Sequence, residues 1–157
     1  MIFQKVRTGD RVPDFRLLNQ DGKLIDIRSQ LGKPIVIYFY PKDNTIGCTK
    51  EACAFRDDYH QFSKAGVKVF GISADTVESH RKFRIKYRLP FDLLSDENNK
   101  VRNAFGVQAD LFGLIPGRVT YVIDGKGVIR HTYNNQMNAT KHVDESLRIL
   151  KKLNVLK

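Results

Sequence analysis

The stretch that decides the fold is IVIYFYPKDNTIGCTKEACAFRD, residues 35–57. Its first six residues form a continuous β-branched and aromatic run, which is typical of a central strand covered on both faces. Beyond that run, four apolar residues recur at intervals of three, four and three, which places them on one face of a helix. They are Ala52, Phe55, Tyr59 and Phe62. The stretch therefore predicts a buried strand, a short loop and a helix that begins close to Cys48.

Strands and helices alternate on either side of this stretch. Upstream, residues 15–17 and 24–27 predict two short strands, and Asp21-Gly22 between them is the turn signal of an N-terminal hairpin. Downstream, residues 67–73 predict a second buried strand, and residues 76–87 predict a helix that Pro90 ends.

The C-terminal half continues the same alternation. A short strand or a loop is expected at residues 91–94, and a short helix at residues 100–105. Strands at residues 120–124 and 128–133 flank Gly125-Lys126-Gly127, a good hairpin signal. A closing helix has an apolar stripe of Val143, Leu147 and Leu150, with Ile149 and Leu153 beside it. This order predicts one three-layer α/β domain over residues 1–157, without linker or repeat.

The composition is that of an ordinary globular protein, with 157 residues, of which 41% are hydrophobic and 28% are charged. No apolar run approaches the ~18 residues that a membrane helix needs. The N-terminal segment MIFQKVRTGD lacks the apolar stretch of a secretory signal, although a processed presequence would leave no trace in this sequence. We expect the cytoplasm or another reducing compartment, and no membrane partner.

Cysteine and histidine usage argues against a structural metal and against a disulfide scaffold. Two cysteines are too few for such a scaffold, and a bridge between Cys48 and Cys53 would close a tiny loop, where the entropic gain is smallest. The four histidines lie singly, without metal-ligand spacing. They are His60, His80, His131 and His142. We therefore expect neither a metal nor another cofactor.

Cys48 lies between the buried strand and the helix, where backbone N–H groups are unpaired. A helix start stabilises a thiolate as it stabilises carboxylates and phosphates, and the thiolate is the nucleophilic form of cysteine. Cys48 also extends the apolar helix face, four residues before Ala52, so its sulfur should face inward. From the residues alone, a buried and inert cysteine is an equally good interpretation.

Cys53 follows Cys48 by five residues, which in a helix is about 7.5 Å of rise and about 140° of rotation. That separation exceeds the ~7 Å between Cα atoms that a disulfide tolerates. Either the pair never forms a bridge, or the first turn of the helix unwinds when it does. A small packed residue on the helix flank is the alternative for Cys53.

Pro41, Thr45 and Cys48 reproduce the signature P-x-x-x-T-x-x-C of the peroxiredoxins. The run GCTKEACAFRD resembles the bacterioferritin-comigratory, or Q-type, subgroup, which places its resolving cysteine five residues after the peroxidatic one, as Cys53 stands here. VPDF, LLSDENNKV and PGRVTYVID, beginning at residues 12, 93 and 116, extend the similarity over essentially the whole chain. The resemblance implies a thioredoxin-like fold, in which helices flank a central mixed β-sheet with an N-terminal hairpin.

The resemblance also implies a thiol peroxidase with an atypical two-cysteine mechanism, serving antioxidant defence and redox homeostasis. Cys48 would reduce hydrogen peroxide or an organic hydroperoxide to water or an alcohol and become a sulfenic acid. Cys53 would then form an intramolecular disulfide with it, and thioredoxin or a similar dithiol protein would reduce that disulfide. Because the second cysteine is local, a monomer is expected.

Further residues gain roles from the same resemblance. Arg118 corresponds to the family's active-site arginine, whose charge would favour the Cys48 thiolate and hold a peroxide oxygen. The Thr45 hydroxyl would accept a hydrogen bond from the peroxide and donate one toward it or the sulfur. Pro41 would shape the loop and shield the sulfur from water. Glu51 is interpreted most simply as an acidic residue in the first helical turn, and a catalytic role is the less favoured alternative.

Ile46 departs from the subgroup, which often has proline after the threonine of its signature. Losing that proline frees a backbone dihedral just before the helix. We therefore expect a less rigid loop, and we keep as a hypothesis that the bulkier Ile46 narrows substrate access.

A formal charge of +10 and the basic segment HRKFRIKYR, residues 80–88, raise a second hypothesis. Five cations with Phe83 and Tyr87 interleaved would suit a nucleic-acid surface, in a binding or redox-sensing protein whose Cys48 oxidation is a signal. The cations are Arg81, Lys82, Arg84, Lys86 and Arg88. We favour a solvated helix face whose two aromatic residues contact the core, so nucleic acid is not the expected partner.

Overall fold

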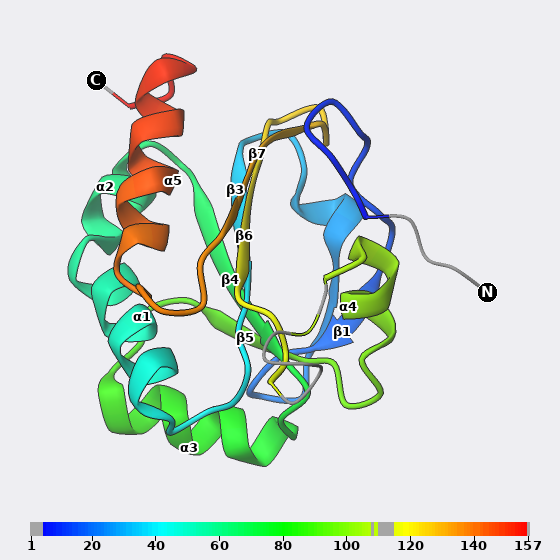
Figure 1. Ribbon diagram of the computed structural model, residues 1–157, viewed down its shortest axis with the longest axis vertical. Helices are drawn as coiled ribbons and strands as arrows, with labels where there is room; N and C mark the ends of the chain where they lie inside the picture. The colour runs from blue at the N-terminus through cyan, green and yellow to red at the C-terminus, as the bar shows by residue number, and fades with distance from the viewer. Residues whose placement is uncertain (1–4, 108, 110–114, 157) are drawn as a thin grey trace.

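Seven strands form one mixed β-sheet in the computed structural model of the chain, in the order β2-β1-β5-β4-β3-β6-β7 (Figure 1). The structure describes residues 5–107, 109 and 115–156, so the first four residues of the N-terminal segment lie outside it. The strands are β1 (Arg16–Leu18), β2 (Leu24–Asp26), β3 (Ile35–Phe39), β4 (Lys68–Ser73), β5 (Asp92–Ser95), β6 (Val119–Ile123) and β7 (Ile129–Asn134).

β3 lies inside the sheet, as its uninterrupted apolar run predicts, and all five of its residues are buried. It pairs in parallel with β4 and antiparallel with β6, in a register that sets Phe39 opposite Val119. β1 and β2 form the predicted N-terminal hairpin, which joins the sheet through β5. The ends of β3 and β6 that meet at this register carry the residues of the site described below.

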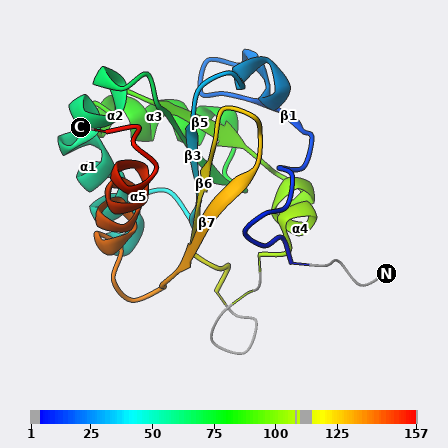
Figure 2. The ribbon, with the colours of Figure 1, turned by 90° about the horizontal axis from the view of Figure 1, so that it is seen from above.

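Helices cover both faces of the sheet, giving the predicted three layers (Figures 1 and 2). The helices are η1 (Ile27–Gln30), α1 (Ile46–Asp57), α2 (Tyr59–Lys64), α3 (Val77–Tyr87), α4 (Lys100–Phe105) and α5 (Lys141–Lys152). The apolar side chains of α1, α2, α3 and α5 pack in one core cluster, and those of α4 pack in the other. Within the described residues, no helix combines the length and the apolarity that a membrane span requires.

The predicted helix after the loop is divided into α1 and α2 at Asp58. Its apolar face nevertheless meets the core, because Phe55 and Phe62 are fully buried and Tyr59 is half-buried. The segment at residues 91–94, predicted as a short strand or a loop, is a strand, since β5 covers Asp92–Ser95. The short helix η1 was not predicted, and the other elements lie within one or two residues of the bounds predicted for them.

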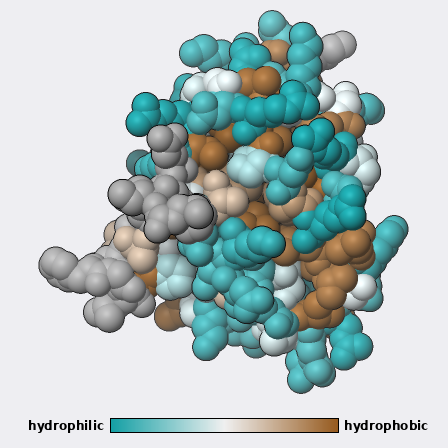
Figure 3. Space-filling view, turned by 90° about the vertical axis from the view of Figure 1, so that its right-hand side faces the viewer, coloured by the Kyte–Doolittle hydropathy of each residue, from teal (hydrophilic) through white to brown (hydrophobic). Residues whose placement is uncertain are grey.

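The face that carries α4 and the N-terminal hairpin shows apolar side chains among polar ones (Figure 3). Leu18 and Leu24 of the hairpin are 42% and 55% exposed. Neither residue belongs to the core cluster that contains Cys48.

Candidate active site

Cys48 is the third residue of α1, and its side chain is 1% exposed. It belongs to the same core cluster as Ala52 and Phe55, so its sulfur faces inward as the spacing predicts. The loop of residues 41–45 carries the chain from β3 to α1, where Thr45 occupies the N-cap position. The local sequence therefore brings a thiol to a helix start and removes it from solvent.

Two hydrogen-bond donors point at the sulfur of Cys48. The Lys42 backbone N–H lies 3.5 Å from Sγ, and Arg118 Nη2 lies 3.3 Å from it. Arg118 directly precedes β6, and the pairing of β6 with β3 brings it beside the loop. A cationic donor and an amide donor thus both direct positive charge at the sulfur.

Glu51 holds the other side of the Arg118 guanidinium. Its Oε1 accepts a hydrogen bond of 2.5 Å from Nη1, and Glu51 is 0% exposed. Gly47 makes room for this arrangement, since a Cβ atom there would lie 3.0 Å from Arg118 Nη2. The simplest interpretation of Glu51 is therefore wrong, because it lies beyond the first turn of α1 and is an internal partner of Arg118.

A second buried group, His142 of α5, lies beside this carboxyl. Its Nδ1 is 3.6 Å from Glu51 Oε2, an oxygen that accepts no hydrogen bond from the described residues. Nε2 of His142 donates to the Asn135 carbonyl at 2.8 Å, and Nδ1 accepts from the Thr120 hydroxyl at 2.7 Å. This is the neutral form of the ring.

Burial moves the pKa values of these two groups in opposite directions. Loss of hydration raises the pKa of Glu51 to about 8, although the charge and the hydrogen bond of Arg118 oppose the rise. Loss of hydration also lowers the pKa of His142 to about 4. Near neutral pH Glu51 therefore holds its titratable proton, and the His142 ring is neutral with its single N–H at Nε2.

Arg102 of α4 is a positioning residue that the sequence did not reveal. It is 5% exposed, and its guanidinium donates to the carbonyl oxygens of Tyr40 and Gly117, each at 2.7 Å. These carbonyls directly precede Pro41 and Arg118, so one side chain ties together the two segments that form the site. A single arginine in a short helix leaves no periodic signal, and only the sheet topology brings it here.

The other residues predicted for the site lie around Cys48 in different roles. The Thr45 hydroxyl donates to the Lys42 carbonyl at 2.9 Å, which leaves its oxygen lone pairs as acceptors. Pro41 is half-buried in the loop. Ile46, at the start of α1, is 79% exposed. Its side chain therefore stands largely in solvent, and its effect on substrate access stays a hypothesis.

Cys53 lies in the same unbroken helix as Cys48 and is partly exposed, and both cysteines are free. Burial raises the pKa of the Cys53 thiol, and the charge of Arg56 opposes the rise. The helical separation that forbids a bridge is therefore present in this state, and a disulfide requires part of α1 to unwind.

The basic segment forms most of α3. Phe83 is fully buried and stacks edge-to-face with the half-buried Tyr87, with ring centroids 5.2 Å apart. The aromatic residues are thus core contacts, as we favoured, rather than a platform for bases. Four of the five cations are exposed, namely Arg81, Lys82, Lys86 and Arg88.

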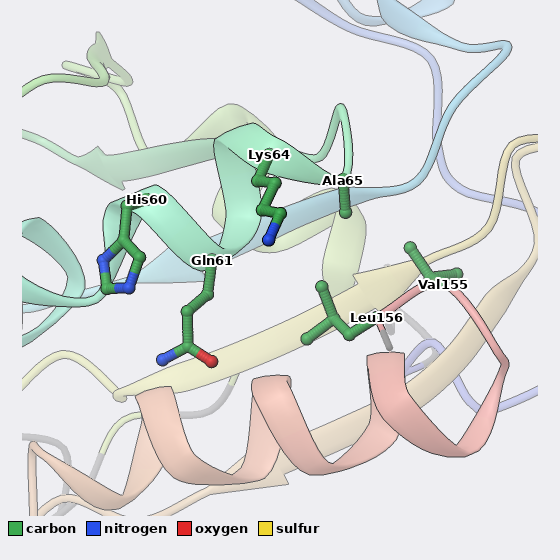
Figure 4. Close-up of a pocket in the computed structure, with 6 residues that line it drawn as sticks. All are labelled: His60, Gln61, Lys64, Ala65, Val155 and Leu156. Atoms are coloured by element: carbon green, nitrogen blue, oxygen red, sulfur yellow. The ribbon is translucent and has the colours of Figure 1, made fainter.

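A separate cavity of about 480 Å³ lies between the end of α2 and the chain that follows α5 (Figure 4). It is lined by His60, Gln61, Lys64, Ala65, Val155 and Leu156. This lining contains neither a thiol nor a carboxylate, and it includes no residue of the loop that precedes Cys48. The chemistry is therefore assigned to Cys48 and its donors.

The comparisons with known proteins agree with this geometry. The AhpC/TSA family matches residues 8–132. Peroxiredoxin Q of Populus jackii, a chloroplastic protein, is 57% identical over 152 residues, which cover 97% of this chain and 71% of that protein. Among solved structures, peroxidoxin BcpB from Mycobacterium tuberculosis is similar with a TM-score of 0.85 at 36% identity, covering 93% of this chain and 97% of that one.

A bacterioferritin comigratory protein of Xanthomonas campestris, studied for its alkyl peroxide reduction activity, is similar with a TM-score of 0.81 at 32% identity, covering 88% of this chain and 91% of that one. The resemblance first seen in the signature around Cys48 is thereby confirmed along nearly the whole chain. The chain belongs to the AhpC/TSA family and is a peroxiredoxin, a thiol peroxidase with a thioredoxin-like fold.

Proposed function

We propose that the chain reduces hydroperoxides with Cys48 as the peroxidatic cysteine and Cys53 as the resolving cysteine, within one domain over residues 1–157. The observation that carries the proposal is the buried Cys48 sulfur with two donors on it, 3.3 Å from Arg118 Nη2 and 3.5 Å from the Lys42 N–H. An inert packed cysteine would have no need of a buried cation at this distance.

The first step is nucleophilic attack on the peroxide. The Cys48 thiolate bonds to the nearer oxygen while the O–O bond breaks, giving a sulfenic acid and, with one proton, water or an alcohol. Arg118 would hold the peroxide oxygens and stabilise the negative charge that develops on the leaving oxygen. The Thr45 oxygen would accept the peroxide O–H, and Pro41 would shape the loop and keep water from the sulfur.

The second step forms the disulfide. The Cys53 sulfur attacks the Cys48 sulfenic sulfur and displaces the hydroxyl as water, so that both thiols are consumed and one S–S bond forms. Because the two Cα atoms lie too far apart in α1, the first helical turn must unwind before the sulfurs meet. The oxidised protein therefore differs in shape from the reduced one near Cys48.

The third step regenerates both thiols by exchange with an external dithiol, for which thioredoxin or a similar protein is the expected partner. Because the exchange needs a reductant pool, we place the chain in the cytoplasm or another reducing compartment, such as the plastid that houses the poplar relative. A resolving cysteine in the same helix needs no second subunit, so we propose a monomer. The exposed cations of α3 suit a partner with an acidic face better than they suit nucleic acid, because the aromatic residues between them are held in the core.

The test is the loss of free thiols in the reduced protein after one equivalent of peroxide, with the product mapped by mass spectrometry. Rapid loss of both thiols and a Cys48–Cys53 disulfide are expected. Cys48→Ser should abolish the reaction, whereas Cys53→Ser should still consume peroxide once and stop at the sulfenic acid. Undiminished turnover in Cys48→Ser would refute the assignment. Salt-sensitive binding to DNA or RNA with negligible peroxide turnover would favour the binding-protein hypothesis instead.

A further inference from the structure

A buried polar cluster ties the loop before Cys48 to α3, and the proposed mechanism makes no use of it. Its centre is the carboxylate of Asp43, which is 4% exposed. Oδ1 accepts a hydrogen bond of 2.6 Å from the Tyr40 hydroxyl. Oδ2 accepts one of 2.9 Å from the Ser79 hydroxyl and lies 2.8 Å from Nδ1 of His80, which is 0% exposed.

Both ring nitrogens of His80 have polar partners. Nε2 lies 3.0 Å from the Leu94 carbonyl oxygen, which can only accept, so Nε2 donates. Nδ1 faces Asp43 Oδ2 at 2.8 Å and the Tyr40 hydroxyl at 3.4 Å. The ring therefore connects β5 to the loop through polar contacts at both of its nitrogens.

The same cluster holds the backbone of the loop. The Asp43 N–H donates to Asp75 Oδ2 at 2.8 Å, and the preceding N–H, that of Lys42, is the amide donor on Cys48 Sγ. Asp43 is thus held at its side chain and at its peptide group, one residue from the donor that faces the sulfur. The residue after it, Asn44, has a left-handed φ of 64°, a conformation that Asn tolerates well.

We propose that Asp43 and His80 are positioning residues for the peroxidase reaction, because their contact aims the Lys42 N–H at the Cys48 sulfur. The proposal rests on the proposed role of Cys48. It also predicts where the chain can unwind, since the loop is anchored through Asp43 and the unwinding segment would begin after it.

A metal site is the competing explanation of the cluster, since ligand atoms of Asp43, Asp75 and His80 lie within 4.8 Å of one another. Those atoms are already engaged, however. Asp75 Oδ2 accepts both the Asp43 N–H and the Ser73 hydroxyl, the latter at 2.6 Å. A cation would have to displace several of these bonds, so the cluster is better explained as a support for the loop.

Two substitutions of His80 separate positioning from mere packing. The side-chain nitrogen of Asn falls near the place of Nδ1, and that of Gln falls near the place of Nε2. His80→Asn therefore keeps the donor to Asp43 and loses the bond to Leu94, and His80→Gln does the reverse. Each variant loses one buried hydrogen bond, so each serves as the stability control for the other.

Both variants are made in a Cys53→Ser background, so that Cys48 reacts alone. We expect His80→Gln to slow Cys48 oxidation by hydrogen peroxide about tenfold, the effect of losing one aimed hydrogen bond to a charged group. His80→Asn should restore the rate to within about twofold of the parent. The pH profile of Cys48 alkylation by iodoacetamide should move to higher pH in His80→Gln and stay in place in His80→Asn.

Three results would overturn the proposal. The first is that both variants match the parent in peroxide rate and alkylation profile, whatever their melting temperatures. The second is an equal loss of peroxide rate in both variants. The third is a larger loss of peroxide rate in His80→Asn than in His80→Gln. Iodoacetamide reports on Cys48 independently of peroxide chemistry. If Cys48 of the Cys53→Ser parent reacts with iodoacetamide but not with peroxide, the proposed function is refuted. The alkylation profiles of the two His80 variants would still test the positioning role of Asp43 and His80.

Discussion

Replacing Glu51 with Gln should change how the stability of the fold depends on pH. The carboxyl is fully buried, contacts Arg118 at 2.5 Å and has a pKa of about 8, against a usual value of 4.5. Between these two pH values the folded chain holds a proton that the unfolded chain has released. Stability contributed by Glu51 is therefore complete below pH 4.5 and is lost as the pH rises through about 8.

His142 has the opposite effect, because its pKa falls from 6.5 to about 4 on folding. Between these values the unfolded chain holds the extra proton, so stability rises with pH. The two slopes cancel between pH 4.5 and 6.5. Above pH 6.5 only Glu51 still changes the stability with pH, up to its pKa of about 8. Over these roughly 1.5 pH units, at about 1.4 kcal/mol per unit, the free energy of unfolding should fall by about 2 kcal/mol.

The assay is urea unfolding of the reduced protein, followed by circular dichroism, in pH steps from about 4 to about 9. The free energy of unfolding of Glu51→Gln should stay constant roughly between pH 6.5 and 8, where that of the natural chain falls by about 2 kcal/mol. Asp57→Asn is the matched control, since Asp57 lies on the same helix but its carboxylate is 67% exposed. Parallel curves for Glu51→Gln and the natural chain over this range would show that the folded protein does not hold a proton on Glu51.

Three further changes test other contacts of the site. Arg102→Lys should reduce the free energy of unfolding by about 2–4 kcal/mol and slow peroxide reduction, because a lysine cannot bridge the Tyr40 and Gly117 carbonyls. Unchanged stability in urea unfolding and unchanged rates in stopped-flow kinetics would contradict this. Ile46→Pro places proline at the first position of α1, which should raise stability by about 0.4–1 kcal/mol and slow the formation of the disulfide by restraining the first turn. The rate of peroxide consumption should stay the same, because the Ile46 side chain is 79% exposed, and a faster rate would support the hypothesis that Ile46 narrows access. The rate at which thioredoxin reduces the disulfide should fall as the salt concentration rises, whereas the rate with dithiothreitol should not. An equal salt dependence of the two rates would show that the basic α3 surface does not attract the reductant.

The parts of the fold that follow from local patterns were predictable from the sequence. The run that forms β3 and the apolar face that begins at Cys48 each depend on neighbours within a few residues, and both predictions are confirmed. The signature around Cys48 also led to Arg118, although only through resemblance. The structure places Arg118 at the sulfur, 70 residues away along the chain.

The parts that the sequence did not reveal depend on contacts between distant segments. Glu51 resembles a helix-start acid in the sequence, and its actual partner lies 67 residues away. The bonds of Arg102 to Tyr40 and of His80 to Asp43 span 62 and 37 residues. Such pairs are created by sheet order and register, which periodicity does not encode, so a buried charge looks like a surface charge until the topology is known.

The arrangement of donors suggests why the reaction steps follow in order. In the proposed mechanism the Arg118 guanidinium and the Lys42 N–H, which both contact the Cys48 sulfur, would hold its thiolate and thereby help to keep the first turn of α1 closed. Oxidation to the sulfenic acid removes that charge and weakens both bonds to the level of neutral hydrogen bonds. Because Asp43 remains anchored to α3, the loosened chain is confined to the segment from Asn44 to the first turn, which is the segment that must open for Cys53 to reach Cys48. In this proposed sequence of steps the charge on the sulfur would couple the chemistry to the unwinding, so that the helix would open after the peroxide has reacted.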